Sequence, residues 1–350
     1  MKVIHTGDIH FGSPFTCRFS KEQAEVRRAE ICSTFRRLVD FAKAQGVRLV
    51  LLAGDVFDGE FPSVRDREFF YGVIENAPQI DFFYLKGNHD LFEEEVALPN
   101  LKRFGKEWRS YSYGNLCVSG IELCGQNCGR FYDELVLDKN KINLVLLHGQ
   151  VSSSVGEGLV ALQRLEGKGI DYLALGHIHS CRFGRIDERG IYAYCGCLEG
   201  RGYDETGEKG FVLLDIDRTL HASFLPFASR TVWEEVVDIS DVCSAVEVIR
   251  KLRERLAFPK KDLVRLVLQG ECGFETEGLE QIVEDAFAGQ YFGFSVKNEA
   301  VRRLDFSKYE GQVSIEGEFV RLVKRDSALT EEEKNEVLKV GLKALSGERV

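Results

Sequence analysis

The sequence lacks the long apolar run that a membrane-spanning helix requires. No stretch of 18 consecutive apolar residues occurs among its 350 residues, whereas about 20 are needed to cross the hydrocarbon core of a bilayer. The chain also lacks a basic opening segment followed by an apolar one, because a strand pattern begins at Lys2. We therefore expect no membrane association, no secretory signal and a cytoplasmic location.

Three further features are missing. The close cysteine pairs, Cys124 with Cys128 and Cys195 with Cys197, have no second pair at the separation that a structural zinc site uses. Internal repeats and low-complexity segments are absent, so neither a solenoid nor a compositionally biased segment is expected. The chain also has no excess of basic residues, since its net charge is −10. That balance argues mildly against a nucleic-acid partner, which usually leaves a basic footprint.

What the sequence does contain is a set of polar residues at the ends of five strand-like runs, "VIHTGDIHFG", "VRLVLLAGDVFDG", "DFFYLKGNHD", "KINLVLLHG" and "IDYLALGHIHS". Five of the seven histidines lie at these ends. Ligands of open α/β sheets bind beyond the carboxyl ends of the strands. We therefore expect the polar side chains to meet in one cleft: Asp8, His10, Asp55, Asn88, His89, His148, His177 and His179.

The apolar periodicity predicts an α/β catalytic domain over residues 1–230. Strand patterns alternate with helix patterns at 21–45, which ends at Gly46, and at 65–76. After Trp108 come shorter strand patterns separated by glycine, namely "YSYGNLCVSGIEL", "GIYAYCGCL", "GEKGFVLLDID" and "LHASFLPF". These predict a second sheet packed on the first. The expected fold class is therefore α/β, a four-layer α/β/β/α sandwich.

Residues 231–325 are expected to form a smaller α+β cap domain. Their strand patterns alternate with helix patterns at 242–256 and 277–287, and they contain no histidine. This β-α-β-α-β unit is large enough to fold as a small domain.

Residues 326–350 are expected to form a C-terminal helix and tail. Thr330 and Glu333 make a capping-box pattern before the helix, and Gly347 follows its end. An apolar stripe that includes Leu338 and Leu342 runs along this helix and must be buried against something. The sequence leaves two interpretations open, packing on the chain's own cap or docking on a partner protein.

The polar residues at the strand ends suit two metal ions. Carboxylates, an amide oxygen and several imidazoles are too many for one ion and right for two. Nitrogen and oxygen ligands without thiolate favour Mn, Fe or Zn over Mg and Ca, and Mg stays an option. Asp55 is placed to bridge the ions and reduce their repulsion. Two divalent cations would cancel the net −4 of residues 1–230, so the total charge does not decide whether nucleic acid binds.

One histidine can remain off the metals and protonate a leaving oxygen. His89 is the candidate, because its neighbour Asn88 can supply a ligand oxygen. A histidine acid needs a carboxylate that holds its ring in place. Asp58 and Asp90 are both candidates for that carboxylate.

Four other polar positions are expected to be structural or solvated. We expect Asp90 to be a helix N-cap or a solvated residue and not a catalytic one. We expect His5 to be a strand residue that packs within the sheet. Arg27 and Arg28 are expected on the solvated face of their helix.

The motifs "GDIH", "GDVFD", "GNHD", "HG" and "GHIH", in this order from Asp8 to His179, resemble those of the calcineurin-like metallophosphoesterases. The segments "RRAEICSTFRRLVDFAKAQGVRLVLLAGDVFDG" and "YCGCLEGRGYDETGEKGFVLLDI" resemble more closely the SbcD-type exonucleases, the nuclease subunits of a DNA double-strand-break repair complex, and their meiotic-recombination relatives. The resemblance covers about residues 1–320, and in the cap it rests on the order of the elements.

The resemblance implies specific roles. One metal would lie on Asp8, His10, Asp55 and His179, and the second on Asp55, Asn88, His148 and His177. His89 would be the leaving-group acid, oriented by Asp58. Manganese is the ion the family usually uses, its cap faces DNA, and its partner is an ABC-type ATPase of the structural-maintenance class. The acidic charge and the single helix expected after the cap depart from the family pattern.

The sequence thus predicts a two-metal phosphodiesterase that acts on DNA, a Mn-dependent 3′–5′ exonuclease with single-strand endonuclease activity in DNA repair. The direction of cleavage comes from the resemblance alone, and a homodimer is an option. One alternative is a phosphodiesterase or phosphatase for a small molecule such as a nucleotide, with the cap closing a pocket. A second is a non-catalytic scaffold for an ATPase partner, which a missing metal ligand would have favoured.

Overall fold

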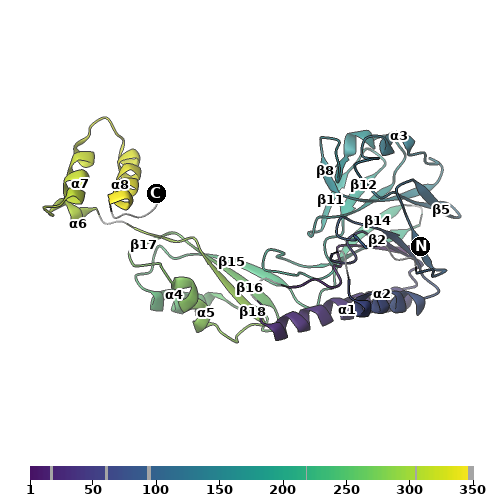
Figure 1. Cartoon of the computed structure of the whole chain (residues 1–350), viewed down its shortest axis with the longest axis horizontal. Coiled ribbons are helices and arrows are strands. Elements are labelled where there is room, and N and C mark those ends of the chain that lie inside the picture. The colour runs from purple at the N-terminus through teal and green to yellow at the C-terminus, as the bar shows by residue number, and fades with distance from the viewer. Residues whose placement is uncertain (16–18, 60–61, 93–95, 218, 304–305, 346–350) are drawn as a thin grey trace. The chain divides into compact units, whose positions relative to one another are not determined.

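The computed structural model describes residues 1–350 except 16–18, 60–61, 93–95, 218, 304–305 and 346–350 (Figure 1). Within the described residues the chain forms two compact units. The first comprises Met1–Glu234, Phe258–Arg265 and Gly289–Ser295, and the second comprises Glu235–Ala257, Leu266–Ala288 and Val296–Val350.

The first sheet of the first unit has the strand order β14-β13-β1-β2-β3-β4. Its strands are β1 (Lys2–Thr6), β2 (Leu49–Ala53), β3 (Asp81–Leu85), β4 (Leu101–Arg103), β13 (Gly210–Ile216) and β14 (Leu220–Pro226). Strands β1 to β4 are parallel, whereas β13 is antiparallel to β1 and β14 to β13. The prediction that the last two strand patterns join the second sheet is therefore wrong, because β13 pairs along the edge of β1 instead.

The second sheet has the order β11-β12-β10-β7-β6-β5. Its strands are β5 (Arg109–Tyr113), β6 (Leu116–Gly120), β7 (Ile142–His148), β10 (Tyr172–Gly176), β11 (Arg182–Arg185) and β12 (Ile191–Tyr194). The inner strands are parallel, and β5 and β11 pair antiparallel at the two edges. Two short strands, β8 (Gln150–Ser152) and β9 (Leu159–Ala161), pair with each other.

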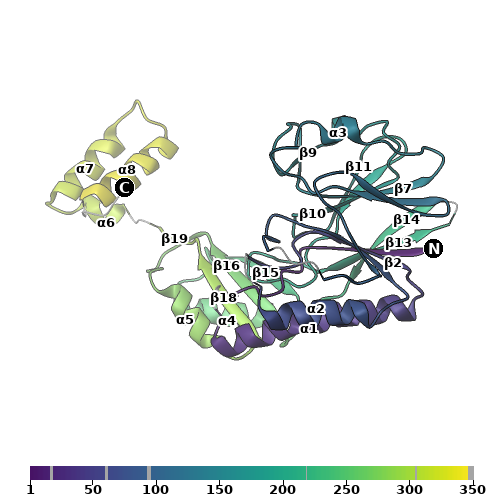
Figure 2. The ribbon, with the colours of Figure 1, turned by 45° about the vertical axis from the view of Figure 1, so that its right-hand side comes forward.

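The two sheets pack face to face between outer layers. Alternate side chains of a strand point to opposite faces, and in β2 Val50 and Leu52 pack toward the helices while Leu49 and Leu51 pack toward the second sheet. Figures 1 and 2 show α1 (Lys21–Ala44) and α2 (Val64–Glu75) side by side along the first sheet. The outer layer of the second sheet includes α3 (Phe131–Glu134) and η1 (Leu162–Arg164). The predicted α/β/β/α sandwich is confirmed.

Helix α1 ends as predicted but its polar face differs from the prediction. Gly46 has φ of 67°, a left-handed conformation that glycine adopts without steric cost. Arg27 is fully buried, and its Nη2 lies 2.9 Å from Oε2 of Glu199. Arg28 is half-buried. The expectation of a solvated arginine at position 27 is wrong, because a carboxylate from a distant loop neutralises it within the core.

A three-stranded sheet, β15-β16-β18, follows the α/β/β/α sandwich in the sequence. Its strands are β15 (Val232–Asp238), β16 (Leu263–Gln269) and β18 (Gly293–Asn298), with α4 (Ala245–Arg255) after the first and α5 (Leu279–Ala286) after the second. This is the β-α-β-α-β order that the sequence predicted. The division between the two units passes through all three strands. The short strands β17 (Glu271–Cys272) and β19 (Val301–Arg302) pair in parallel.

The second unit also contains α6 (Ser307–Glu310), α7 (Ile315–Arg325) and α8 (Glu331–Leu345). Helices α7 and α8 lie side by side (Figure 2). Among the described residues after position 325, α8 is the one helix, as predicted. Helix α7 lies at the end of the predicted cap, was not predicted, and packs against α8. Leu338 and Leu342 of α8 are buried in a cluster with Val320 and Val323 of α7. These two leucines therefore pack within the chain, in agreement with the interpretation that the helix packs on the chain's own cap.

The capping box of α8 is confirmed. The Thr330 N–H donates to Oε2 of Glu333 at 2.8 Å, and the Glu333 N–H donates to Oγ1 of Thr330 at 3.3 Å. Gly347, expected after the end of this helix, lies outside the described residues.

Candidate metal centre

The predicted site residues come from the ends of strands in both sheets. In the first sheet Asp8 and His10 follow β1, Asp55 follows β2, and Asn88 and His89 follow β3. In the second sheet His148 ends β7, and His177 and His179 follow β10. The sequence predicted that these residues meet in one cleft, and the structure brings them together from two stacked sheets.

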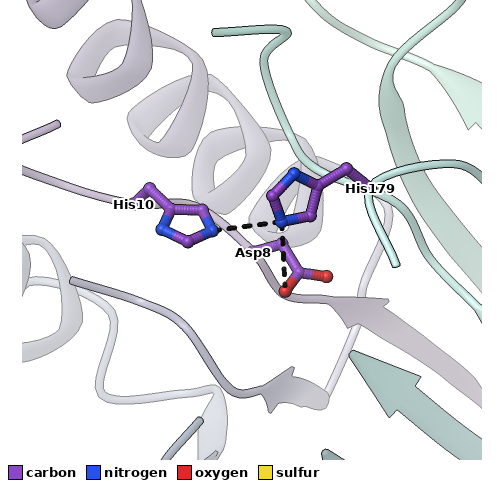
Figure 3. A group of neighbouring side chains, drawn as sticks. All are labelled: Asp8, His10 and His179. Atoms are coloured by element: carbon purple, nitrogen blue, oxygen red, sulfur yellow. Dashed lines mark hydrogen bonds and ion pairs between the residues drawn. The ribbon is translucent and has the colours of Figure 1, made fainter. Parts of the chain in front are cut away.

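One group consists of Asp8, His10 and His179 (Figure 3). The Nε2 atoms of His10 and His179 are 3.3 Å apart, and Nε2 of His179 lies 4.0 Å from Oδ1 of Asp8. Only one proton fits between two imidazole nitrogens at this distance. A cation that accepts both lone pairs suits the arrangement better than a hydrogen bond does.

A second group consists of Asp55, His148 and His177, with Asn88 beside them. A third, made of His10, Asp58 and His89, shares His10 with the first. Oδ1 of Asn88 lies 2.9 Å from Nε2 of His148 and 3.0 Å from Nδ1 of His177. Nε2 of His148 is 3.4 Å from Oδ2 of Asp55. Two imidazoles, a carboxylate and an amide oxygen thus converge on one point, which is a donor set of the kind that Mn, Fe and Zn accept.

Asp55 lies between the two groups. Its Oδ2 is 3.9 Å from Nε2 of His10 in the first group and 3.4 Å from Nε2 of His148 in the second. Its other oxygen, Oδ1, accepts a hydrogen bond from the His89 N–H at 2.8 Å, which fixes the carboxylate in this orientation. The geometry is the one that a bridging carboxylate needs.

The ionisation of these groups shows that the cluster attracts positive charge. Burial raises the pKa of Asp8 to about 6, against the opposing charges of His148 and His179. Burial also acts on Asp55, but the hydrogen bond and charge of His148 outweigh it and hold that pKa at about 2. Burial would lower the pKa of His148, yet its bond to Asp55 and the charge of Asp8 raise it to about 9. The two buried carboxylates therefore favour positive charge at this position.

Two of the imidazoles are held so that Nε2 points into the cluster. Nδ1 of His148 lies 2.9 Å from the Ala53 carbonyl oxygen, which can only accept. Nδ1 of His179 lies 2.6 Å from Oε1 of Glu205. A histidine that donates from one nitrogen to an oxygen presents the lone pair of the other nitrogen, as metal-binding histidines do. The residues present therefore fit a dinuclear centre.

Four of the cluster residues have positive φ angles, a backbone conformation that residues other than glycine rarely adopt. The φ angles are 47° at Asp8, 55° at His10, 50° at Asp55 and 98° at His177. Each such residue costs on the order of 1–3 kcal/mol, and such strain concentrates at functional sites. The sequence signal for these turns was a polar residue directly after a strand, but the strain itself was not predicted.

Glycines at the strand ends allow the ligand loops to approach one another. A Cβ at Gly87 would overlap the carboxylate of Asp55, and a Cβ at Gly176 would overlap the Ala53 carbonyl oxygen. The glycines in the "GNHD" and "GHIH" motifs are therefore required by close packing and not only by a turn.

His89 and Asp58 lie at the edge of the cluster. Nδ1 of His89 is 3.0 Å from Oδ1 of Asp58, and 46% of the His89 side chain is exposed. Asp90, the other candidate partner, is buried and accepts hydrogen bonds from the backbone N–H groups of Val56, Phe57 and Gly87. It is therefore neither a helix cap nor solvated, and of the two carboxylates only Asp58 makes the predicted contact with His89.

His5 behaves as predicted for a packed strand residue. It is fully buried, and its Nδ1 lies 2.8 Å from the Tyr172 hydroxyl.

Sequence reasoning missed two residues next to the cluster. Glu205 contacts His179, and Arg201 contacts both Glu205 and Asp58. Both belong to the loop after β12, which carries no histidine. The only available signal was their presence in the "CLEGRGYDETG" segment, where a charged pair is also common on a solvated loop.

A cavity of about 720 Å³ opens beside the second group. Its walls include the proposed ligands Asn88, His148 and His177, together with Leu123 and Leu159. A phosphoester that reached the cluster could therefore place part of its structure here.

A family model for "Calcineurin-like phosphoesterase" matches residues 1–181, just over half of the chain. The chain belongs to this family. It is therefore a metal-dependent phosphoesterase, a hydrolase with a dinuclear centre for divalent ions. None of the described helices is long and apolar enough to cross a membrane.

This calcineurin-like phosphoesterase is similar to several curated proteins. It is 26% identical over 301 residues to "Uncharacterized metallophosphoesterase YhaO" of Bacillus subtilis, covering 77% of the chain and 72% of that protein. It is 24% identical to "DNA double-strand break repair protein Mre11" of Sulfurisphaera tokodaii, covering 77% of the chain and 74% of that protein. A shorter match, 31% identical over 26% of the chain and 22% of the matched protein, is to a subunit of the nuclease SbcCD of Rhodobacter capsulatus.

Proposed function

We propose that this phosphoesterase cleaves phosphodiester bonds of DNA and works in DNA repair as a Mn-dependent 3′–5′ exonuclease with single-strand endonuclease activity. The observation that carries the proposal is the position of Asp55 between two groups of metal-binding side chains. The similarity to proteins named for double-strand break repair supports DNA as the substrate. The similarity to a protein named as part of a nuclease supports the same substrate.

The metal ligands in this proposal follow the two groups. One ion would lie on Asp8, His10, Asp55 and His179, and the other on Asp55, Asn88, His148 and His177. Two divalent ions held there would supply an activated water and positive charge against the phosphoryl oxygens. Imidazole and oxygen donors without thiolate suit Mn, Fe or Zn. Manganese is the ion we propose among them, because the resemblance to the SbcD-type exonucleases implies it.

In this proposal His89 supplies the proton that the leaving oxygen needs. Its Nδ1–H donates to Asp58, so the opposite nitrogen of the protonated ring can give its proton to the departing group. The partial exposure of the ring supports this role, because a substrate can reach it from solvent.

The parts outside the catalytic sandwich have proposed roles as well. Residues 231–325 form the cap that guides DNA, and residues 326–350 complete the C-terminal region. Ile315, Leu322 and Val340 are exposed apolar residues on α7 and α8. We propose that they dock an ABC-type ATPase of the structural-maintenance class, as helix-in-groove contacts do. A homodimer belongs to the same proposal.

The test is cleavage by the purified full chain with Mn²⁺, on linear duplex DNA labelled at the 3′ or the 5′ end, on circular single-stranded DNA and on bis(4-nitrophenyl) phosphate. Asp8→Asn is the metal-site control. We expect mononucleotide release from 3′ ends and nicking of the circle, both lost in the control. Cleavage of the chromogenic ester alone would favour a small-molecule phosphodiesterase. No cleavage by a protein that holds two ions would favour a scaffold.

A further inference from the structure

Arg201 touches both carboxylates that hold the imidazoles at the edge of the cluster. Its Nη1 lies 3.3 Å from Oδ2 of Asp58, and its Nη2 lies 3.0 Å from Oε1 of Glu205. Those carboxylates in turn contact His89 at 3.0 Å and His179 at 2.6 Å. One guanidinium therefore lies between the proposed leaving-group acid and a proposed metal ligand.

The loop holds Arg201 and Glu205 as a unit. The backbone N–H of Arg201 donates to Oε2 of Glu205 at 2.6 Å, while its Nε–H donates to Oε1 at 3.2 Å. The backbone and the side chain of Arg201 thus donate hydrogen bonds to both carboxylate oxygens of Glu205. The planar fork of the guanidinium fixes the direction of its remaining N–H groups, which a flexible lysine would not do.

The same contacts argue against a direct role of Arg201 in binding the phosphate. Asp58 and Glu205 both lie against its guanidinium, so its positive charge is largely compensated within the protein. Only 20% of its side chain is exposed. An arginine that binds a phosphate presents a free fork of N–H donors, whereas Nε, Nη1 and Nη2 of Arg201 each already have a partner.

We propose that Arg201 is a positioning residue that orients His89 through Asp58 and His179 through Glu205. The inference rests on the proposed function, because it takes His89 as the leaving-group acid. In this arrangement the positions of both His89 and His179 depend on Arg201, a residue of the loop after β12.

The test compares thymidine 5′-(4-nitrophenyl phosphate) with thymidine 5′-(phenyl phosphate), which differ only in how much the leaving group needs a proton. We expect Arg201→Ala to slow the phenyl ester at least about 10-fold more than the nitrophenyl ester, as a fraction of the 10²–10⁴-fold that general acid catalysis contributes. This extra loss should disappear when His89→Ala is already present. Arg201→Lys should lie between wild type and Arg201→Ala.

A second measurement tests the contact of Arg201 with Glu205 by metal binding, without relying on catalytic activity. Mn²⁺ binding by calorimetry should weaken at least about 3-fold for the ion on the His179 side in both Arg201→Ala and Glu205→Gln, and elemental analysis should still find the other ion. Arg189, which pairs with Asp171 at 2.8 Å on the protein surface, is the matched control. Arg189→Ala should change neither the ester ratio nor the binding of Mn²⁺.

Three outcomes would overturn the inference. Equal losses on both esters that persist in the His89→Ala background would make Arg201 a phosphate-binding residue. An unchanged ester ratio with unchanged Mn²⁺ binding would show that it has no positioning role. If Arg201→Ala does not fold, a wild-type ester ratio in Arg201→Lys would also show that Arg201 has no positioning role. If His89→Ala itself fails to discriminate between the esters, the acid assignment fails, and that result is separate from the behaviour of Arg201.

Discussion

Oδ2 of Asp55 lies 3.4 Å from Nε2 of His148, so the carboxylate that follows β2 meets the imidazole that ends β7 of the other sheet. Asp55 and His148 are far apart in the sequence. They meet because the two sheets stack with the carboxyl ends of β2 and β7 beside each other. The site is therefore sensitive to any change that alters how the two strand ends face each other.

Asp55→Asn should remove both ions, because an amide at the bridging position carries no negative charge against two divalent cations. We expect elemental analysis to find close to no metal and activity to fall at least about 10²-fold. Asp133→Asn, on an exposed carboxylate that pairs with Arg164, is the control and should retain both ions. Two ions per chain in Asp55→Asn would remove Asp55 from the bridge.

His89→Ala should leave both ions in place and slow only substrates whose leaving group needs a proton. A deoxyribose oxygen needs one and nitrophenolate hardly does, so we expect a loss of about 10²–10⁴-fold on DNA and a much smaller loss on a nitrophenyl phosphodiester. Metal content and the two rates are measured together. Equal losses on both substrates would mean that His89 binds metal or substrate instead.

Gly87→Ala should disturb the bridge without changing any ligand. The new Cβ would overlap the Asp55 carboxylate, and such overpacking costs about 1–3 kcal/mol. We expect at least a 10-fold weaker affinity for Mn²⁺ and a lower melting temperature. Gly105→Ala, where a Cβ meets no atom within 4 Å, should bind Mn²⁺ like the wild type. Unchanged metal affinity in Gly87→Ala would show that Asp55 is free to move.

His5 should make the protein less stable in acid. Burial lowers its pKa to about 3 in the folded chain, below the ordinary value of 6.5. Its contribution is therefore fully present above pH 6.5 and is lost as the pH falls toward 3, because the unfolded chain binds a proton that the folded chain does not. Between pH 7 and pH 5 this loss is about 2 kcal/mol.

The measurement is the free energy of unfolding in urea at the two pH values, for wild type and His5→Gln. The packing change caused by glutamine is the same at both pH values and cancels in the difference. The wild type should lose about 2 kcal/mol more than the variant on acidification. An equal loss in both proteins would show that His5 is not held neutral in the core.

The C-terminal helix pair allows its buried and exposed faces to be separated by mutation. Leu338→Asp with Leu342→Asp places two charges in the cluster with Val320 and Val323, which should cost several kcal/mol and unfold the pair. Leu322→Asp with Val340→Asp changes residues that are 61% and 51% exposed and should leave the melting temperature within about 2 °C. Only the second variant then tests docking, by loss of ATPase binding from a folded protein. Retained binding would refute the docking surface.

The strand ends could be recognised from the sequence because the information there is local. An apolar run followed by Gly-Asp, Gly-Asn, Gly-His or His-Gly determines both a buried strand and a polar turn at its end, within about ten residues. The same holds for Gly46 after α1 and for the capping box of Thr330 and Glu333, since caps depend on neighbouring residues. The predicted site residues that now lie together all came from such local patterns.

Only the tertiary structure decided which residues from distant segments meet. Burial of Arg27 depends on Glu199, and the choice of Asp58 over Asp90 depends on where Asp90 finds three backbone N–H groups. Strands β13 and β14 joined the first sheet because the free edge of β1 accepted them, which no periodicity encodes. Arg201 became part of the site through contacts that include Asp58, 143 residues away, and His179, 22 residues away. Local propensity thus determined the elements and the ligand types, whereas long-range pairing, whose partners no short pattern specifies, determined the site.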